Sequence, residues 1–337
     1  MPTEPTSKPR QRDEEIAERI KALPGTLTYL DLMARNRRDS VLLITLMLTL
    51  AGVLGGVLGS LVVSYAGAGF SWTGLAIGVG LAVLVGGGVT LWSWYNGSKA
   101  ILGMTHAHEV DPKLDPELYN IVDEMRLAAG MPMPKVYVVG DSALNAFATG
   151  RGPKQGVVAV TSGLRMKLER DELQAVIAHE IAHIRHLDIR FAMLMATLVG
   201  LIAVVCDGVI RVGIHGGARA AASRDKGQII LLAVGAIAVI LAPILARLIQ
   251  MGYSRQREFL ADAGAVELTR NPLGLASALM KIRDDKDPYV DTANRGVAHM
   301  FFSNPLERRR KKKARKNWMS SHPPIDERIA RVLALTR

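Results

Sequence analysis

The chain has little cysteine and few aromatic residues. Its 337 residues include a single cysteine, Cys206, so an intramolecular disulfide and a cluster of thiolate metal ligands are both excluded. Aromatic residues make up 5% of the chain, whereas hydrophobic residues make up 49% and glycine occurs 32 times. This combination is typical of transmembrane helix bundles, in which small residues let helix backbones approach closely. Cys206 itself lies in an apolar run, where a small packing residue is expected.

Four apolar segments are each long enough to cross a bilayer core of about 30 Å. They are residues 41–65, 70–94, 191–205 with an extension toward 214, and 229–246. Asp207 and Arg211 interrupt the far end of the third segment at a spacing of four, where they could pair on one helix face. A mostly polar stretch precedes the first segment, which disfavours a cleavable signal peptide. The sequence therefore predicts four transmembrane helices.

Basic residues outnumber acidic ones and give a formal net charge of +11. Several of them flank the apolar segments, including Arg35, Arg37 and Arg38, and the run RRRKKKARK occupies residues 308–316. A membrane surface accounts for this charge. No helix-turn-helix, zinc-finger or RNA-recognition pattern accompanies it, so we expect the lipid bilayer as the partner, and no nucleic acid.

The apolar segments divide the chain into five parts. We expect a charged N-terminal extension (1–40), a first transmembrane hairpin (41–94), a first soluble part (95–189), a second transmembrane hairpin (190–250) and a second soluble part (251–337). In the first soluble part, PELYNIVDEMRLAAG predicts a helix, and KVYVVG, LNAFATG and GVVAVTSG predict three short strands. The fold class is thus a mainly α integral membrane protein with an α+β soluble domain that contains a small β-sheet.

The orientation follows from the number of spans. A cytoplasmic N-terminus places both soluble parts on the cytoplasmic side and residues 215–228 outside. The outer segment carries Arg219, Arg224 and Lys226, which runs against the positive-inside rule.

Residues 179–183 read His-Glu-Ile-Ala-His, an H-E-x-x-H sequence within a helix predicted from about Glu169. Residues four apart share a helix face, so His179 and His183 can converge on one ion while Glu180 reaches a water molecule on it. Zinc accepts neutral imidazole and carboxylate, and with three protein ligands it keeps a fourth position for water. We therefore expect one Zn²⁺ per chain, Glu180 as general base and a zincin-like catalytic domain. The alternative is a set of satisfied polar groups at a membrane interface.

The third ligand has to come from elsewhere in the chain. A metzincin would have Gly and His three and six residues after the second His, but His186 and Ile189 stand there, which excludes that class. The stretch SRQREFLADAGAVEL at 254–268 offers Glu258 as a ligand, with Asp262 one turn later on the same face. Asp262 would accept a hydrogen bond from a ligand imidazole and fix its tautomer. The alternative here is an ordinary amphipathic helix with solvated acids.

The distance of these residues from the membrane supports one shared site. A continuous helix would carry His183 about 12 Å from the start of the third span, and Glu258 about 18 Å beyond the end of the fourth. Because those spans form a hairpin, their extensions would start side by side, and the ligands would meet just above the membrane. Asp188 could cap or orient the helix of His183, and no ligand role follows from its spacing.

Six motifs occur in a specific order between about residues 95 and 335. They are NAFATG (145–150), VTSGL (160–164), DEL (171–173), HEIAH (179–183), SRQREFLAD (254–262) and SSHPPIDER (320–328). Together with the four-span layout, this set resembles the HtpX family of bacterial membrane-bound zinc metalloproteases, relatives of the CAAX prenyl endopeptidases. The resemblance implies a gluzincin-type endopeptidase of the inner membrane, with its active site facing the cytoplasm, that acts in the stress response and in quality control of damaged membrane proteins. It carries over His179, His183 and Glu258 as zinc ligands and Glu180 as the base.

One motif bears on substrate binding. If residues 145–148, which include Asn145, Ala146 and Phe147, form a strand with a free edge beside the zinc, that edge would pair with an extended substrate through main-chain hydrogen bonds. The alternative is a plain strand–turn junction, which Asn and Gly also suit.

Two residues near the C-terminus are candidates for stabilising the oxyanion of a tetrahedral intermediate. They are His322 and Arg328, and a donor aimed at such developing charge contributes about 3 to 4 kcal/mol. The alternative for His322, which precedes two prolines, is that it marks the start of the last helix.

Three functions are open on these grounds. A membrane zinc endopeptidase would act on membrane-protein or unfolded polypeptide substrates. A CAAX-type processing peptidase would act on prenylated substrates, but four spans are too few for the large intramembrane chamber that this resemblance implies. A scaffold with structural zinc would need four protein ligands, and three candidates have convincing spacing. The sequence favours the endopeptidase.

Overall fold

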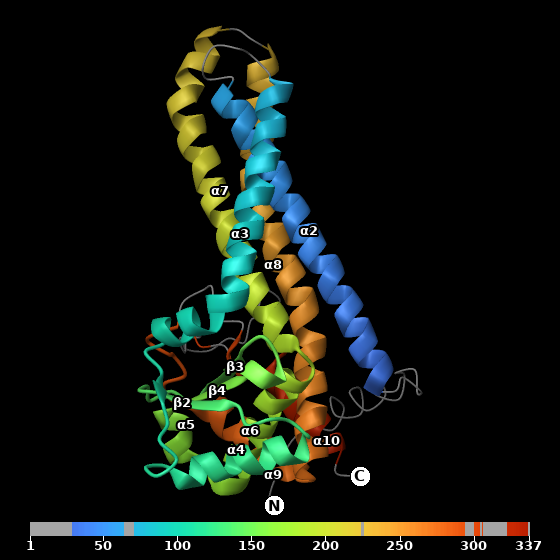
Figure 1. Cartoon of the computed structure of the whole chain (residues 1–337), viewed down its shortest axis with the longest axis vertical. Coiled ribbons are helices and arrows are strands. Elements are labelled where there is room, and N and C mark those ends of the chain that lie inside the picture. Colours follow the sequence, from blue (N-terminus) through green and yellow to red (C-terminus); the bar gives the residue numbers. More distant parts are fainter. Residues whose placement is uncertain are drawn as a thin grey trace, which may run out of the picture.

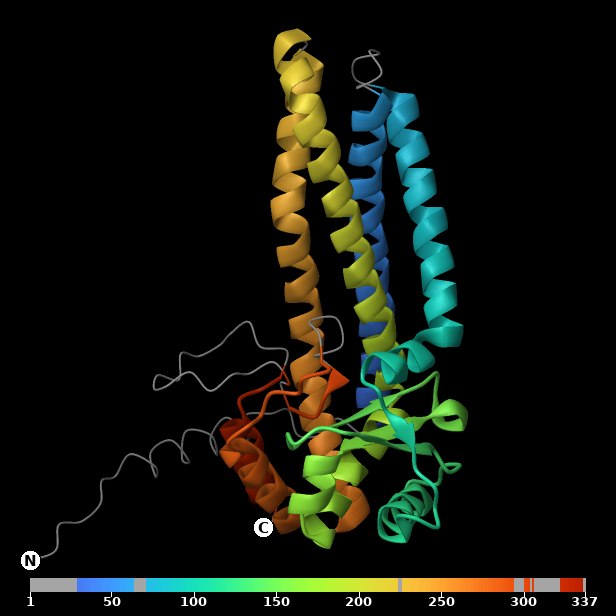
Figure 2. The same ribbon diagram turned by 90° about the vertical axis from the view of Figure 1, so that its left-hand side faces the viewer.

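The computed structural model describes residues 29–63, 71–223, 226–293, 300–303, 305 and 322–335. A bundle of long helices stands at one end of the molecule, and a part that combines helices with a small sheet lies at the other (Figures 1 and 2). We call the second part the catalytic part. The basic run at 308–316 and most of the predicted N-terminal extension lie outside the described residues.

Four long helices form the bundle. They are α2 (Tyr29–Val63), α3 (Trp72–Met104), α7 (Asp188–Ser223) and α8 (Lys226–Thr269). Three of them contain stretches long and apolar enough to cross a membrane, namely Thr45–Val63, Trp72–Met104 and Asp188–Arg211. The apolar stretch described in α8, Ala233–Leu245, is shorter. The first three predicted spans are thus found as apolar helices, and the fourth stays a prediction.

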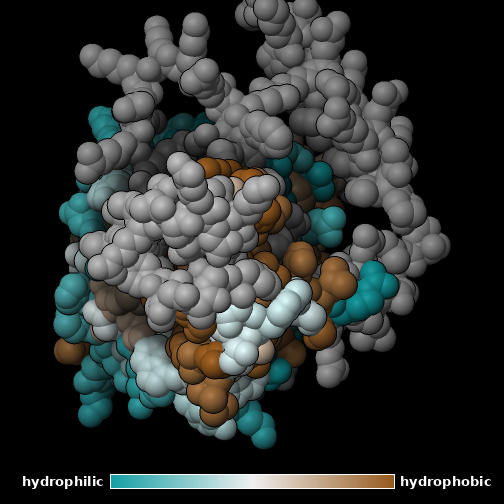
Figure 3. All heavy atoms as spheres, turned by 90° about the horizontal axis from the view of Figure 1, so that it is seen from above, coloured by the Kyte–Doolittle hydropathy of each residue, from teal (hydrophilic) through white to brown (hydrophobic). Residues whose placement is uncertain are grey.

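Large apolar side chains stay exposed along the bundle. Examples are Leu42, Val53, Leu84, Val204 and Ile240. Seen from the bundle end, apolar residues gather over the helices and hydrophilic residues appear at the margin of the view (Figure 3). Soluble proteins rarely expose so large an apolar surface, whereas a bilayer would cover it. The chain is therefore a membrane protein.

Glycines let α2 and α3 pack closely. Gly55 and Gly59 on α2 lie against Gly74 and Gly78 on α3, and the two members of each pair are one helical turn apart. A Cβ atom added to Gly78 would lie 2.1 Å from the carbonyl oxygen of Gly55, and one added to Gly59 would lie 2.4 Å from that of Gly74. Small-residue faces of this kind hold membrane helices together by van der Waals contact between backbones.

The sheet has four strands in the order β1-β2-β4-β3. β1 (His108–Glu109) pairs antiparallel with β2 (Lys135–Val139), β2 runs parallel to β4 (Val157–Thr161), and β4 pairs antiparallel with β3 (Ala146–Thr149). The three predicted strands are confirmed. The sequence did not indicate β1, because two exposed residues are too few to show an alternating pattern.

Shorter helices pack against the sheet and against one another. They are α4 (Pro116–Ala128), α5 (Ser162–Lys167), α6 (Arg170–Arg185), α9 (Pro272–Asp284) and α10 (Ile325–Ala334), with a 3₁₀ turn at Pro153–Gln155. α6 is central, and residues 175–182 within it are all buried. One apolar cluster joins Val176 of α6 to Val160 of β4, Leu279 of α9 and Ile329 of α10. The two predicted soluble parts therefore share one core.

The helix that carries the H-E-x-x-H sequence ends before the bundle. α6 stops at Arg185, and α7 starts at Asp188 after Leu187, whose φ of 64° lies in the left-handed region. The prediction of one continuous helix into the third span is therefore wrong. Leucine does not favour this conformation, so the sequence held no signal for the break. The break brings Asp188 back toward His183, whereas residues five apart on a continuous helix differ by about 140° around the axis.

Candidate metal centre

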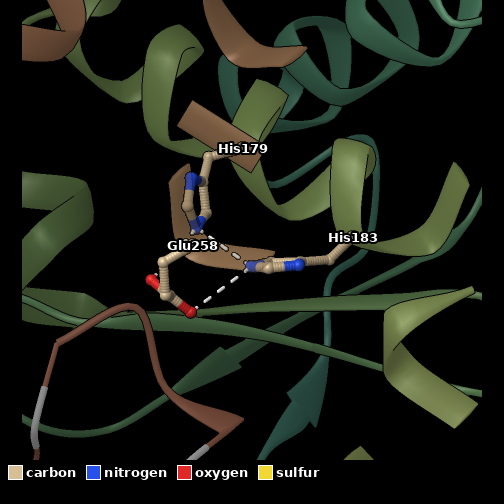
Figure 4. A group of neighbouring side chains, drawn as sticks. All are labelled: His179, His183 and Glu258. Carbon is tan, nitrogen blue, oxygen red and sulfur yellow. Dashed lines mark hydrogen bonds and ion pairs between the residues drawn. The ribbon is translucent and has the colours of Figure 1, made fainter. Parts of the chain in front are cut away.

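Two imidazoles and a carboxylate converge where α6 meets α8 (Figure 4). His179 and His183 project from one face of α6, and Glu258 projects from α8, which runs without interruption from the bundle to this point. The two Nε2 atoms are 3.1 Å apart, and the carboxylate oxygens of Glu258 lie 3.7 Å from Nε2 of His183 and 3.8 Å from Nε2 of His179. The three ligand atoms lie within 4.8 Å of one another, close enough to share one cation.

Each imidazole also contacts an aspartate through Nδ1, the ring nitrogen that does not face the cluster. Nδ1 of His179 lies 3.0 Å from Oδ1 of Asp262, one turn beyond Glu258 on α8. Nδ1 of His183 lies 3.0 Å from Oδ2 of Asp188, at the start of α7. When Nδ1 donates its proton to a carboxylate, Nε2 presents a lone pair, so both imidazoles offer Nε2 to the same point. Once both imidazoles are neutral, this donor set of two imidazoles and one carboxylate fits Zn²⁺.

Each of these aspartates in turn faces an arginine. Arg328 donates two hydrogen bonds to Asp262, at 2.9 and 2.7 Å, and Nε of Arg257 lies 3.3 Å from Oδ1 of Asp188. Burial alone would raise the pKa of Asp262, but the charge of Arg328 and the hydrogen bonds outweigh it, and this pKa is lowered. Asp262 therefore stays ionised and accepts a hydrogen bond from the imidazole of His179, and Asp188 lies between the guanidinium of Arg257 and the imidazole of His183.

The three cluster residues differ in their electrostatics. Burial lowers the pKa of His179 to about 4, so this imidazole is neutral and ready to bind a metal ion. Burial also acts to lower the pKa of His183, but the hydrogen bond to Asp188 outweighs it and raises that pKa to about 9. Burial acts to raise the pKa of Glu258, yet the nearby His322 and Arg328 lower it, so Glu258 is ionised. A cation at the cluster would therefore meet the negative charge of Glu258 and displace one proton from His183.

Glu180 lies beside the cluster and is almost completely buried. Burial raises the pKa of its carboxyl to about 8, and a backbone hydrogen bond from Ala148 of β3 acts in the opposite direction. A carboxylate in such a site is a stronger base than one in water, and its pKa lies near neutral pH. Glu180 is thus placed between the cluster and the edge of the sheet.

His322 and Arg328, the two residues predicted to stabilise an oxyanion, both lie next to the carboxylate of Glu258. Nδ1 of His322 is 3.5 Å from Oε2 of Glu258, and Nη1 of Arg328 is 3.2 Å from the same oxygen. Arg328 is 2% exposed and also donates through Nη1 to the backbone carbonyl of Phe302, at 2.9 Å. Arg328 therefore contacts three groups, which are the carboxylates of Glu258 and Asp262 and the backbone carbonyl of Phe302.

The predicted free edge of β3 is occupied. Phe147 forms an antiparallel bridge with Phe301, and the amide of Phe302 donates to the carbonyl of Ala146 at 2.7 Å. The side chain of Asn145 contacts both backbone groups of Ser303, because Nδ2 donates to its carbonyl at 3.0 Å and Oδ1 accepts from its amide at 3.1 Å. The prediction of a free edge along Asn145–Phe147 is therefore wrong.

Sequence reasoning missed three contacts of this site. It gave Asp188 no contact with His183, because the contact depends on the break at Leu187. It also missed Arg257, whose guanidinium stacks on Phe191 at 4.3 Å and faces Asp188. Phe302 lies far from the cluster in the sequence, yet its ring is 4.7 Å from the ring of His179. The position of Arg257 directly before Glu258 was the one available signal.

A family model described as Peptidase family M48 matches residues 112–336, which contain all of these side chains. The chain belongs to peptidase family M48. Curated relatives of this M48 peptidase are named Protease HtpX homolog. The one from Listeria monocytogenes serotype 4a is 44% identical over 270 residues, covering 77% of this chain and 88% of the relative. The one from Streptococcus thermophilus is 37% identical over 308 residues, covering 90% and 98%.

A solved structure is also similar to this M48 peptidase. It is the crystal structure of S. mikatae Ste24p, with a TM-score of 0.40 and 18% identity, covering 77% of this chain and 65% of that one. The family, the near relatives and the apolar helices together identify the chain as a membrane metalloprotease.

Proposed function

We propose that this M48 peptidase is a zinc-dependent endopeptidase that hydrolyses peptide bonds of misfolded or damaged membrane proteins at the bacterial inner membrane. The observation that carries the proposal is the convergence of His179, His183 and Glu258, with each imidazole held at Nδ1 by its own aspartate. Three protein ligands leave a position for water, as in catalytic zinc sites, whereas structural sites are closed by four.

A zinc ion held by His179, His183 and Glu258 would supply Lewis acidity, which lowers the pKa of water and polarises a peptide carbonyl. Glu180 acts as the general base, because it is buried beside the cluster and its pKa is raised to about 8. It accepts a proton from the attacking water and delivers it to the leaving amine. Asp262 and Asp188 keep the imidazoles in the tautomer with the proton on Nδ1. Arg328, which already donates to one backbone carbonyl, is placed to donate to the carbonyl of a substrate, with His322 beside it.

The arrangement of the chain supports a site beside the membrane. The two soluble parts share one core, so both lie on the same side of the bilayer. With four spans and a cytoplasmic N-terminus, that side is the cytoplasm. α8 carries Glu258 on the same helix as the apolar stretch Ala233–Leu245. A polypeptide that leaves the bilayer would therefore meet the site close to the membrane surface.

The test compares the wild-type protein with Glu180→Gln after purification in detergent without metal. We expect both to bind one zinc ion, and we expect only the wild type to cleave an unfolded model protein after zinc is added, with a loss of at least about 100-fold in the variant. The matched control is Glu267→Gln, a half-exposed acid further along α8 that pairs with Arg185. This control should retain both zinc and activity.

Other outcomes would distinguish the alternatives. Zinc bound by both proteins with no cleavage by either would favour a scaffold with structural zinc. Cleavage of a prenylated peptide, without cleavage of the same peptide lacking the prenyl group, would favour a CAAX-type processing peptidase. Full activity of Glu180→Gln would contradict the proposed role of Glu180.

A further inference from the structure

A short stretch of the chain itself lies along the edge of β3 beside the candidate metal centre. This stretch, Met300–Ser303, runs antiparallel to β3. It is joined to β3 by one described backbone hydrogen bond, from Phe302 to Ala146, and by the two contacts between the Asn145 side chain and Ser303. An extended peptide that adds to a sheet edge makes the same kind of contact.

At this point of β3, backbone groups that a second strand would need already have hydrogen-bond partners. The carbonyl of Ala146 accepts from Phe302, and the amide of Ala146 donates to Oδ1 of its neighbour Asn145 at 3.1 Å. The backbone hydrogen bond of Ala148 reaches Glu180. Alternate residues of an edge strand point their polar backbone groups outward, and these are the groups an incoming peptide would need.

Phe302 also occupies the space next to the cluster. Its ring is 4.7 Å from the ring of His179 and lies 4.5 Å from the guanidinium carbon of Arg328. Its carbonyl accepts the hydrogen bond from Nη1 of Arg328 at 2.9 Å. We propose that the same donor, Nη1 of Arg328, binds a substrate carbonyl. The carbonyl of Phe302 therefore takes the hydrogen bond that a bound peptide would make.

We propose that Met300–Ser303 is an internal pseudosubstrate, and that the true substrate is an extended, apolar polypeptide segment that displaces it. The proposal rests on the proposed function and adds its substrate class and its regulation. Met300, Phe301 and Phe302 are 8%, 2% and 1% exposed, so an apolar segment can replace their contacts. A polar segment would leave the same apolar surface, which includes Phe147 5.0 Å from the ring of Phe301, poorly covered. Folded proteins hide such segments, and unfolded membrane proteins expose them.

The pairing can be locked by a disulfide. Because Phe302 and Ala146 share a hydrogen bond, Phe147 and Phe301 form a pair without one, in which the Cα atoms are about 4.5 Å apart and within reach of a disulfide. The experiment introduces Phe147→Cys and Phe301→Cys together into a Cys206→Ala chain. We expect the disulfide to form on oxidation, the rate of cleavage of an unfolded apolar reporter to fall at least ten-fold, and reductant to restore it.

A matched disulfide controls for oxidation itself. Glu109 and Tyr137 form the corresponding pair between β1 and β2, at the opposite edge of the sheet. Glu109→Cys with Tyr137→Cys, in the same Cys206→Ala chain, should form a disulfide and leave the rate unchanged. Equal cleavage by the oxidised and reduced Phe147/Phe301 pair would overturn the proposal, as would failure of that disulfide to form.

A second variant and a binding measurement complete the test. Phe301→Ala weakens the docked stretch, so we expect KM for the reporter to fall at least about three-fold with kcat unchanged, as for loss of a competing occupant. A KM that rises instead would contradict the proposal. If the Cys206→Ala parent shows no zinc-dependent cleavage, the proposed function fails, and binding of the fluorescent reporter still decides this inference. Binding to the reduced pair and not to the oxidised pair supports the pseudosubstrate, and equal binding overturns it.

Discussion

Each candidate ligand histidine is oriented by a carboxylate from a different helix. Asp262 reaches His179 from α8, and Asp188 reaches His183 from the first turn of α7. Contacts of this kind fix which nitrogen carries the proton and prevent rotation of the ring. Orientation of the two imidazoles therefore depends on the junctions of the catalytic part with both helices of the second hairpin.

Asp188→Asn tests this dependence. The neutral amide is a weaker acceptor for Nδ1 and cannot hold the charge of Arg257 in the same way, so we expect zinc affinity to fall by about 10- to 100-fold. Competition with a chelator of known affinity measures this fall without any assay of cleavage. Asp171→Asn, on an exposed acid of α6, is the matched control and should leave zinc affinity unchanged. Equal affinities for the two variants would show that Asp188 does not orient His183.

The sequence predicted the cluster where helical spacing alone determines which residues share a face. His179, Glu180 and His183 follow from an unbroken stretch of α6, and Glu258 with Asp262 follow from α8. The contact of Asp188 with His183 could not be predicted, because it depends on an unfavourable backbone conformation at Leu187. The pairing of Met300–Ser303 with β3 could not be predicted either, because a four-residue stretch has no periodicity and its partner is far away in the chain.

At the scale of elements, the strands and helices with strong periodicity were predicted and the junctions between them were not. β2, β3 and β4 each follow an apolar run bounded by turn residues, and α4 begins at an Asp-Pro pair that caps it. The ends of α2 and α6 were not predicted, because helix boundaries have a weaker sequence signal than the periodicity inside a helix. α2 begins at Tyr29, well before the predicted start of the first span, and α6 ends before α7.

The contact between α2 and α3 gives a prediction for the first hairpin. Gly78→Ile places a branched side chain against the backbone of Gly55, where even a Cβ atom would be 2.1 Å from the carbonyl oxygen. We expect the helices to separate and the free energy of unfolding to fall by about 1–3 kcal/mol, seen as a lower Tm in detergent. Gly80→Ile is the control, because nothing lies within 4 Å of an added Cβ there. Equal Tm values for both variants would contradict this packing.

At the scale of the whole molecule, the bundle and the catalytic part are joined through α3, α7 and α8 (Figure 2). The start of α3 lies at the far end of the bundle from the catalytic part. If the bundle spans the membrane, Trp72 and the 3₁₀ turn at Pro153–Gln155 lie on opposite sides of it.

Single cysteines in a Cys206→Ala chain test that orientation. Trp72 is 75% exposed and Lys154 is exposed, so neither substitution disturbs the core. We expect a membrane-impermeant thiol reagent to label Trp72→Cys in intact cells and Lys154→Cys only in inverted vesicles. Labelling of both from one side would exclude the spanning bundle, and the reverse pattern would place the active site outside the cytoplasm.

The separation of the ligands along the chain sets an order of events during synthesis. Glu258 is made about 75 residues after His183, which is several seconds later at roughly 5–20 residues per second. α7 and the apolar part of α8 lie between them, so the second hairpin is complete before the third candidate ligand exists. Phe301 and Phe302 follow Glu258 only after α9. A nascent chain therefore cannot hold a metal ion through all three candidate ligands until its second hairpin has been made, so an unfinished chain at the ribosome would lack the complete centre.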